Sequence, residues 1–167
     1  IMALENLYKD VKVKFTQCVS RSIACEVSNA GVVDSKFINK LEEEMKRIVS
    51  LDIPIIRENV SKDEAIEIYR KNGYFDKIDV LRYREEDTVN IYKCGSYVNY
   101  LYGYMVPSTG CLKDFRLKLY HPGFIVQFPR AEEKGKIPAF ESSLSFGRML
   151  KDASKWSSNI NCNSIAK

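Results

Sequence analysis

The sequence is short of the residues on which most enzyme sites depend. Its 167 residues include one histidine, His121, and five cysteines, none of them in a Cys-x-x-Cys pair. A zinc site needs three or four His, Cys or carboxylate ligands, and the familiar serine and cysteine hydrolases need a histidine base. His121 precedes Pro122 in a predicted turn, with no acid or thiol next to it in the sequence. We therefore expect no catalytic residue and no metal ligand in this chain.

Motifs for phosphate binding and for membranes are missing as well. A P-loop requires GxxxxGK[ST], and the nearest sequence, Gly135-Lys136, lacks the first glycine and the following hydroxyl residue. No apolar run approaches the roughly 20 residues that span a bilayer, and residues 1–4 lack the basic start of a signal peptide. The odd number of scattered cysteines is typical of reduced thiols. These absences predict a cytoplasmic chain with no membrane partner, no cofactor of its own and no phosphoryl transfer by itself.

The remaining composition is that of an ordinary folded module. Hydrophobic residues make up 45% and charged residues 29%, and the length suits one domain. A net charge of +4, from 26 basic and 22 acidic residues, is weaker than nucleic-acid-binding domains usually show. The chain does not begin with Met, and Ile1, Leu4 and Tyr8 recur at helical spacing. We interpret the sequence as one α+β module of a larger protein.

The first third of the chain predicts a hairpin and a helix. Apolar and polar residues alternate at 11–17 and at 22–27, the period of half-buried strands, and the two segments are close enough to pair. A helix should then begin at Asp34 or Ser35, whose side chains can cap its first turn. Its apolar stripe consists of Phe37, Ile38, Leu41, Met45 and Ile48.

The next segments predict an edge strand and two helices. Pro54 near the start of 53–60 favours an edge position, because proline lacks the N–H group that a central strand donates. Residues 61–64 form a capping box, and Gly73 supplies the left-handed position after the helix that follows. A second, shorter helix is expected at 76–83.

From Thr88 onward the sequence is rich in β-forming residues. We expect β structure from Thr88 to Tyr104, punctuated by Gly95 and Gly103, and two more strands at 111–119 and 124–128. A charged link then precedes an amphipathic helix at 146–156. The order of these elements predicts an α+β fold in which helices pack on a mainly antiparallel sheet.

The tyrosines are the most unusual feature of the sequence. Ten are present, and on a continuous strand Tyr100, Tyr102 and Tyr104 would share one face. That face is either packed by helices or is an aromatic pocket for a base or nucleoside. The polar side chains that would complete such a pocket are Lys93, Asn99 and Arg116.

Residues 92–110 also carry a resemblance to a known family. They read Tyr-Lys-Cys-Gly-Ser-Tyr-Val-Asn-Tyr-Leu-Tyr-Gly-Tyr-Met-Val-Pro-Ser-Thr-Gly. They resemble the stretch of threonyl-tRNA synthetases in which a Tyr-x-x-Gly strand leads to Asp-Leu-Cys-x-Gly-Pro-His-Val-Pro-Ser-Thr-Gly. Residues 34–49 and 53–69 resemble further segments of the same domain, so that the resemblance runs from about 4 to 128. It implies the editing, or second additional, domain fold that these enzymes share with alanyl-tRNA synthetases.

The departures from the family's pattern concern the editing site. The resemblance places Leu101 where the family has its Cys ligand, Met105 where it has the following His, and Asn99 where it has an Asp. The family's HxxxH pair has no counterpart, because no histidine precedes His121. Lys77 does match a lysine that the family keeps. The resemblance therefore implies a degenerate site that has lost its metal ligands and its proton-transfer groups.

This degenerate form resembles a second setting more closely. A group of bacterial uridine kinase-like proteins carries such a domain ahead of a P-loop kinase domain, with a pattern that residues 102–110, 120–125 and 128–129 fit. The resemblance implies an editing-like domain at 1–129, a linker and helix at 130–167, and an ATP-dependent kinase domain of the same polypeptide as partner. We expect a non-catalytic binding module for a nucleoside, an amino acid or a tRNA end. A residual editing hydrolase and a purely structural or dimerisation module remain the alternatives. The ligand-binding candidates are Lys77, Lys93, Asn99, Tyr100, Tyr102, Tyr104 and Arg116.

Overall fold

The computed structural model describes residues 1–141 together with positions 149, 152, 155, 156 and 159. The predicted amphipathic helix at 146–156 therefore lies largely outside the described residues. The chain divides into two units, each described here by itself. The first unit comprises mainly Ala3–Glu44 and the chain from Asp114 onward, and the second comprises mainly Met45–Lys113. The predicted boundary between 129 and 130 stays a prediction.

The first unit is built on a four-stranded antiparallel sheet with the strand order β1-β2-β7-β6. The predicted N-terminal hairpin is confirmed: β1 (Lys12–Val19) pairs with β2 (Ser22–Ser28). Ser20 and Arg21 form its turn, and both have positive φ values, of 46° and 57°. Two consecutive left-handed residues are the mark of a type I′ turn, which matches the twist of the strands it joins.

The other two strands of this sheet come from the far end of the sequence. They are β6 (Arg116–Tyr120) and β7 (Gly123–Gln127), and β7 pairs with β2 through Ile23↔Val126, Ala24↔Ile125 and Cys25↔Phe124. The predicted strand at 111–119 is partly wrong, because a 3-10 turn at Thr109–Cys111 precedes β6 and the segment between them is irregular.

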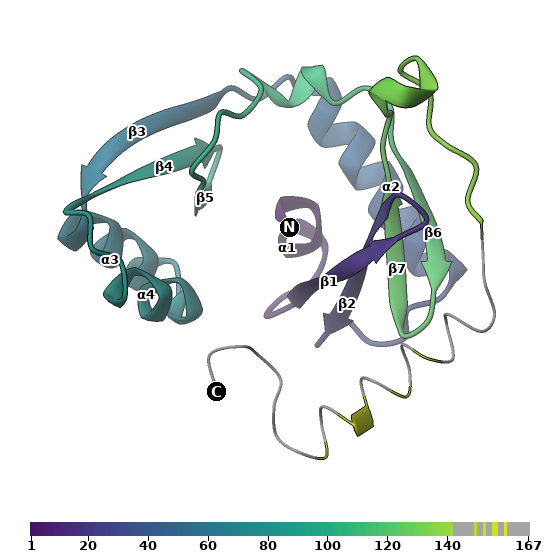
Figure 1. Cartoon of the computed structure of the whole chain (residues 1–167), viewed down its shortest axis with the longest axis horizontal. Helices are drawn as coiled ribbons and strands as arrows, with labels where there is room; N and C mark the ends of the chain where they lie inside the picture. Colours follow the sequence, from purple (N-terminus) through teal and green to yellow (C-terminus); the bar gives the residue numbers. More distant parts are fainter. Residues whose placement is uncertain (142–148, 150–151, 153–154, 157–158, 160–167) are drawn as a thin grey trace. The chain divides into compact units, whose positions relative to one another are not determined.

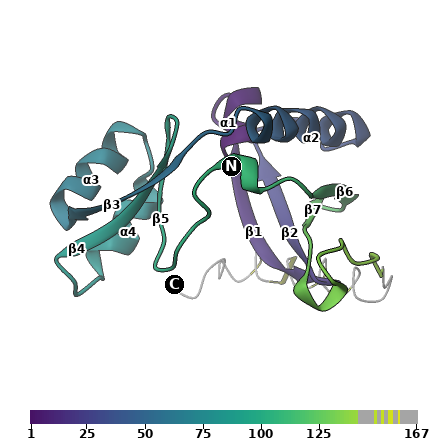
Figure 2. The same cartoon turned by 90° about the horizontal axis from the view of Figure 1, so that it is seen from above.

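Two helices cover one face of the first sheet (Figure 2). They are α1 (Met2–Leu7) and α2 (Ser35–Ser50), and the Asp34 carboxylate caps α2 by accepting a 2.8 Å hydrogen bond from the Phe37 N–H. Phe37 is buried, with its ring centroid 5.1 Å from that of Tyr8 and 6.3 Å from that of Phe124. Four residues of the predicted apolar stripe are buried, namely Phe37, Ile38, Leu41 and Ile48, whereas Met45 is partly buried.

The second unit is a three-stranded antiparallel sheet with two helices on one face (Figure 1). Its strands are β3 (Ile55–Ser61), β4 (Thr88–Cys94) and β5 (Tyr97–Tyr100), and β3 lies at an edge as Pro54 predicted. Its helices are α3 (Lys62–Lys71) and α4 (Phe75–Arg82). The core between the helices and the sheet consists of Val60, Ala65, Tyr69, Ile78, Leu81, Val89, Ile91 and Val98.

The first turn of α3 shows the hydroxyl half of the predicted capping box, and the predicted left-handed glycine follows its last turn. Ser61 Oγ accepts a 3.2 Å hydrogen bond from the Glu64 N–H, and Gly73 has a φ of +73° just beyond the last turn. Without a Cβ, glycine adopts this left-handed conformation at little cost. The chain can therefore reverse immediately into α4, which packs beside α3 on the same sheet.

The predicted α+β class with antiparallel pairing is confirmed, although the strands form two sheets instead of one. The prediction that Tyr100, Tyr102 and Tyr104 share a strand is wrong, because β5 ends at Tyr100 and the chain from Leu101 to Pro107 is irregular. Within the part of the chain that the structure describes, no helix is long and apolar enough to cross a membrane.

The segment that follows β5 is held in place by a clamp of hydrogen bonds. The buried Thr109 donates from Oγ1 to the Ile48 carbonyl at 2.8 Å and accepts from the Ile53 N–H at 2.9 Å. Asp52 Oδ1 accepts from Ser108 Oγ and from the Gly110 N–H. The Pro-Ser-Thr-Gly motif, the most recognisable part of the sequence, therefore ties the end of α2 to the entry of β3.

Candidate functional site

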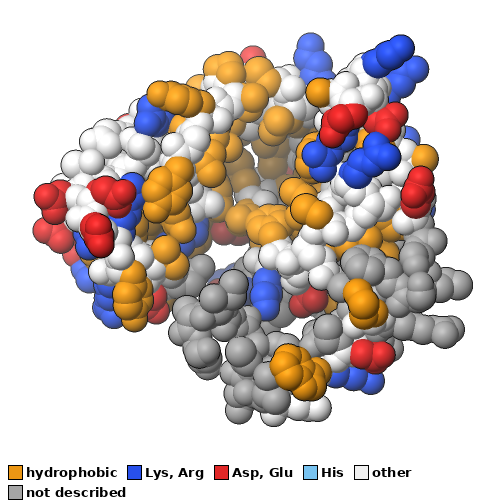
Figure 3. Space-filling model, viewed as in Figure 1, with side chains coloured by type: hydrophobic (Ala, Val, Ile, Leu, Met, Phe, Trp, Pro, Cys, Tyr) orange, Lys and Arg blue, Asp and Glu red, His pale blue; other side chains and the backbone are white. Residues whose placement is uncertain are grey.

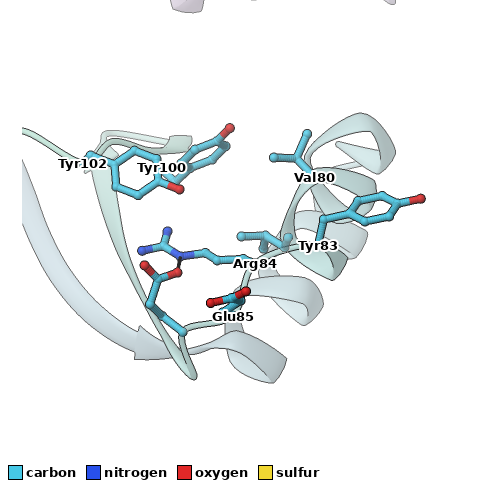
Figure 4. A pocket seen from close by; sticks show the side chains of 8 residues that line it. Val80, Tyr83, Arg84, Glu85, Tyr100 and Tyr102 are labelled. Carbon is cyan, nitrogen blue, oxygen red and sulfur yellow. Dashed lines mark hydrogen bonds and ion pairs between the residues drawn. The ribbon is translucent and has the colours of Figure 1, made fainter. Parts of the chain in front are cut away.

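A pocket of about 330 Å³ lies in the second unit, where the end of α4 and the loop after it meet the end of β5 (Figure 4). The residues that line it are Val80, Leu81, Tyr83, Arg84, Glu85, Glu86, Tyr100 and Tyr102. This volume falls at the lower end of the range of about 300–1,000 Å³ that is typical of small-molecule sites. Hydrophobic side chains are exposed over the same unit (Figure 3).

Arg84 is the most strongly positioned side chain of this pocket. Its Nε donates a 2.8 Å hydrogen bond to Glu86 Oε2, and its guanidinium carbon lies 4.6 Å from the centroid of the Tyr102 ring. The Arg84 side chain is only 13% exposed, so that both the ion pair and the cation–π contact act in a partly desolvated place. The guanidinium is thereby held over one face of the tyrosine ring.

The backbone around Arg84 is fixed by the start of α3 and the end of α4. Lys62 Nζ donates to the Arg84 carbonyl at 2.7 Å, and the Arg84 N–H donates to the Leu81 carbonyl at 3.1 Å. A hydrogen bond from its own backbone N–H, and then Arg84, hold the pKa of the Glu86 carboxyl below its usual range. Glu86 is therefore ionised at neutral pH, and the wall of the pocket is ordered without any ligand.

Tyr100 and Tyr102 form the aromatic wall. Their ring centroids lie 6.3 Å apart, and the rings meet edge to face at 85°. Tyr100 is half-buried and packs on the core of the second unit, whereas Tyr102 is 69% exposed. The two predicted residues are thus brought together here, one as an anchored ring and one as an accessible ring.

A buried hydroxyl lies behind this wall. Tyr69 is fully buried, and burial, followed by the neighbouring Tyr100, raises the pKa of its phenol to about 12. Within the described residues its hydroxyl has no hydrogen-bond partner. Tyr69 is thus a neutral residue of the core on which Tyr100 packs, and it does not line the pocket.

Lys77, another predicted site residue, lies among aromatic rings outside the pocket lining. Its Nζ donates to the Val98 carbonyl at 3.2 Å and lies 3.9 Å from the centroid of Tyr74 and 5.1 Å from that of Tyr97. These contacts join α4 to the edge strand β5. In this structure Lys77 therefore holds a helix against the sheet.

The remaining predicted residues of the second unit are engaged elsewhere. Asn99 donates to the Tyr97 hydroxyl at 3.1 Å and accepts from the Tyr100 N–H at 2.9 Å. Lys93 is paired with Glu58 on the neighbouring strand, and the Arg57 guanidinium carbon lies 4.7 Å from the Tyr104 ring centroid. These residues do not line the pocket, and their role in binding stays a prediction. Arg116 lies in the first unit, exposed at the start of β6.

The positions that the resemblance aligns with the family's metal ligands are also described. Leu101 is 42% and Met105 46% exposed, both in the irregular segment after β5. Over the described residues, no three His, Cys, Asp or Glu side chains gather into a group that could hold a metal ion. His121 is exposed in the turn between β6 and β7.

The cysteines differ widely in exposure. Cys18 and Cys111 are exposed, whereas Cys25 is buried in β2, and burial raises the pKa of its thiol to about 11. Burial also raises the pKa of the Cys94 thiol. All four of these thiols are free, and Cys162 lies outside the described residues. A buried thiol with a raised pKa is a poor nucleophile, so Cys25 serves as a small core residue.

Sequence reasoning missed the Arg84 side of this pocket. Residues 83–87 are a charged run between a helix and a strand, a pattern that ordinarily indicates a solvated loop. A tyrosine-rich strand end and an arginine beside acids were both visible in the sequence. Nothing in their spacing indicated that Arg84 would stack on Tyr102.

Comparisons with known proteins give a relationship for most of the chain. No family model matches it. It is 36% identical over 116 residues to a threonine--tRNA ligase of Bacillus velezensis, which covers 69% of this chain and 18% of that protein. It is 34% identical over 116 residues to threonine--tRNA ligase 1 of Bacillus subtilis, again 69% of this chain and 18% of that protein. It is 40% identical over 87 residues to a threonine--tRNA ligase of Thermotoga neapolitana, which is 52% of this chain and 13% of that protein. The chain thus spans about 18% of the length of the first two relatives.

Proposed function

We propose that this chain, which carries a threonine--tRNA-ligase-like domain over 69% of its length, is a non-hydrolytic module that binds a small ligand. We further propose that the polypeptide it serves is a uridine kinase-like protein. The module senses or positions a ligand for the kinase, and the ATP-dependent chemistry takes place in the kinase domain.

The observation that carries the loss of hydrolysis is the pair Leu101 and Met105. In the family's pattern these positions hold a cysteine and a histidine, which bind metal and transfer protons. A leucine side chain has no donor or acceptor atom, and the thioether of methionine is a weak acceptor that carries no proton. Asn99, at the family's aspartate position, has its amide used by Tyr97 and by the Tyr100 backbone. No group at these three positions can activate a water molecule.

Sequence patterns support the kinase setting. The Tyr-Gly-x-Met-Val-Pro-Ser-Thr-Gly run at 102–110 and the Tyr-x-Pro-Gly-Phe-Ile run at 120–125 fit the uridine kinase-like pattern. The first run supplies the clamp around Thr109, and the second contains the β6–β7 turn. Both runs build the scaffold, so a module of this kind keeps its fold while its former editing site changes.

The chain is expected to leave aminoacyl esters intact. Incubated with seryl-tRNA, it should release serine no faster than buffer does, because no residue at positions 99, 101 or 105 can deliver water to the ester. Release of labelled serine is followed over time, with an editing-competent threonine--tRNA ligase as positive control. Release that is faster than buffer and rises in proportion to the concentration of the chain would show that hydrolysis persists.

The complete polypeptide is expected to phosphorylate uridine. The γ-phosphoryl group of ATP passes to a hydroxyl of uridine and leaves ADP, which chromatography measures directly. The 167-residue chain should transfer none when tested alone, because it lacks GxxxxGK[ST]. If the complete polypeptide instead charged tRNA with threonine and left uridine unchanged, the kinase setting would be wrong.

A further inference from the structure

We propose that the pocket lined by Tyr100, Tyr102, Arg84 and Glu85 binds an uncharged nucleoside and discriminates against its phosphorylated forms. This inference rests on the proposed function, since it names the ligand class of a module expected to bind a small molecule. Positions 99, 101 and 105 do not line this pocket, although Asn99 and Leu101 adjoin Tyr100 in the sequence.

The shape of the pocket suits one planar ring. The Arg84 guanidinium covers one face of the Tyr102 ring, so a ligand ring stacks on its exposed face, and the anchored Tyr100 meets Tyr102 edge to face (Figure 4). The apolar Val80 and Leu81 close the helix side of the cavity. Every nucleobase has a π-face that stacks on an aromatic side chain, and such stacking tolerates any base. A volume of about 330 Å³ admits a single small molecule and is too small for a folded chain segment.

The charges of the lining oppose phosphate. Among the residues that line the pocket, the two carboxylates of Glu85 and Glu86 outnumber the one guanidinium of Arg84, and Lys62 lies behind them with its Nζ bonded to the Arg84 carbonyl. Glu86 already neutralises Arg84 through their 2.8 Å hydrogen bond. A phosphate group entering the pocket would meet a guanidinium that is already paired and the unpaired charge of a second acid. Like charges repel, and because Glu85 and Glu86 are exposed to solvent, this repulsion lowers the affinity for a nucleotide most at low ionic strength.

The same carboxylates favour the hydroxyl groups of a sugar. An ionised carboxylate only accepts hydrogen bonds, and it accepts them strongly from O–H donors. In Figure 4, Glu85 lies below Arg84 while Tyr100 and Tyr102 lie above it. A ligand whose ring lies against the tyrosines therefore directs its hydroxyl-bearing part toward the acids. A nucleoside combines these two parts in one neutral molecule.

The wall is also preorganised. The contacts of Arg84 with Glu86, Tyr102, Lys62 and Leu81 fix the loop after α4 through the chain's own groups. A site that is already ordered loses less conformational entropy when a ligand binds. Small ligands without charge-assisted anchors depend on this effect more than nucleotides do.

The test is titration calorimetry of the chain with uridine, adenosine, uridine monophosphate and threonine. We expect both nucleosides to bind, with affinity at least about tenfold higher for uridine than for its monophosphate.

Tyr102→Ala should weaken nucleoside binding at least about tenfold, because it removes the stacking ring. Phe75→Ala is the matched control: it removes another exposed aromatic ring of the same unit that lies outside the pocket lining. Glu85→Gln should reduce the difference in binding affinity between uridine and uridine monophosphate, because it removes one negative charge from the lining.

The outcomes separate the two proposals. Tighter binding of the monophosphate than of uridine, or equal losses in Tyr102→Ala and Phe75→Ala, would overturn the nucleoside pocket. Binding of threonine without either nucleoside would overturn it too, while leaving a ligand-binding module in place. If none of these compounds and no deacylated tRNA binds, the ligand-binding function itself fails. Thermal unfolding of each variant, measured in parallel, verifies that the substituted chains are folded.

Discussion

Replacing Thr109 with valine is expected to destabilise the second unit by about 2–4 kcal/mol. Valine has nearly the same shape, so the change leaves no large cavity and removes only the hydroxyl. That hydroxyl donates to the Ile48 carbonyl and accepts from the Ile53 N–H, at 2.8 Å and 2.9 Å. Thr109 is only 5% exposed, so water cannot easily replace the hydrogen bonds of its hydroxyl. Each buried backbone group left without a partner costs about 1–3 kcal/mol.

The matched control is Thr109→Ser, which keeps both hydrogen bonds and deletes one methyl group. It should cost only about 1 kcal/mol. Urea unfolding followed by circular dichroism, with tyrosine fluorescence as a second probe, measures both variants. If the valine variant is as stable as the serine variant, the hydroxyl of Thr109 contributes nothing to the free energy of unfolding, and the residue acts only through its shape.

The clamp explains why the most recognisable motif predicts the fold better than the site. Val-Pro-Ser-Thr-Gly signalled a family, and the structure shows its threonine, with Asp52, tying three backbone segments together. Such contacts depend on backbone geometry that any member of the fold needs. Chemistry depends on side chains such as those at 101 and 105, which change without harm to the scaffold. A motif of the first kind identifies a domain whatever chemistry its site carries.

Local features were predictable because they depend on neighbours in the sequence. The cap at Asp34, the box at 61–64 and the glycine after α3 each involve residues within four positions of one another. The pairing of β2 with β7 joins residues about 100 positions apart, as in Cys25↔Phe124, and no periodicity encodes it. This is why one sheet was expected and two were found.

The candidate site was predictable only in part, for the same reason. Tyr100 and Tyr102 stood out because tyrosines are concentrated there, and both line the pocket. The end of β5 after Tyr100 was not visible, since Leu101 and Tyr102 continue the β-forming composition. Arg84 reaches Tyr102 across 18 positions of sequence, through a turn whose geometry only the folded chain defines. A stacking contact between residues far apart in the sequence produces no regular spacing from which it could be predicted.

Gly123→Ala is expected to be the most damaging single substitution, with a loss of about 3 kcal/mol or more in the stability of the first unit. A Cβ at this position would lie 2.0 Å from the Cys25 carbonyl oxygen and 3.1 Å from the Glu26 Cα. Both neighbours belong to the backbone of β2, which cannot move aside as a flexible side chain could. The β2–β7 pairing beside it must therefore open, and overpacking of this kind is costly.

Cys25 provides a direct readout of that opening. It is buried, with a thiol pKa of about 11, so iodoacetamide at pH 8 should label Cys18 and Cys111 long before it labels Cys25. In Gly123→Ala, separation of β2 from β7 should expose Cys25, and mass spectrometry should find it modified at a rate approaching that of the exposed thiols. Gly103→Ala is the control, because a Cβ there meets no atom within 4 Å, and it should leave both stability and labelling nearly unchanged. A Gly123→Ala chain in which Cys25 stays protected would show that β2 and β7 accommodate the methyl group without separating.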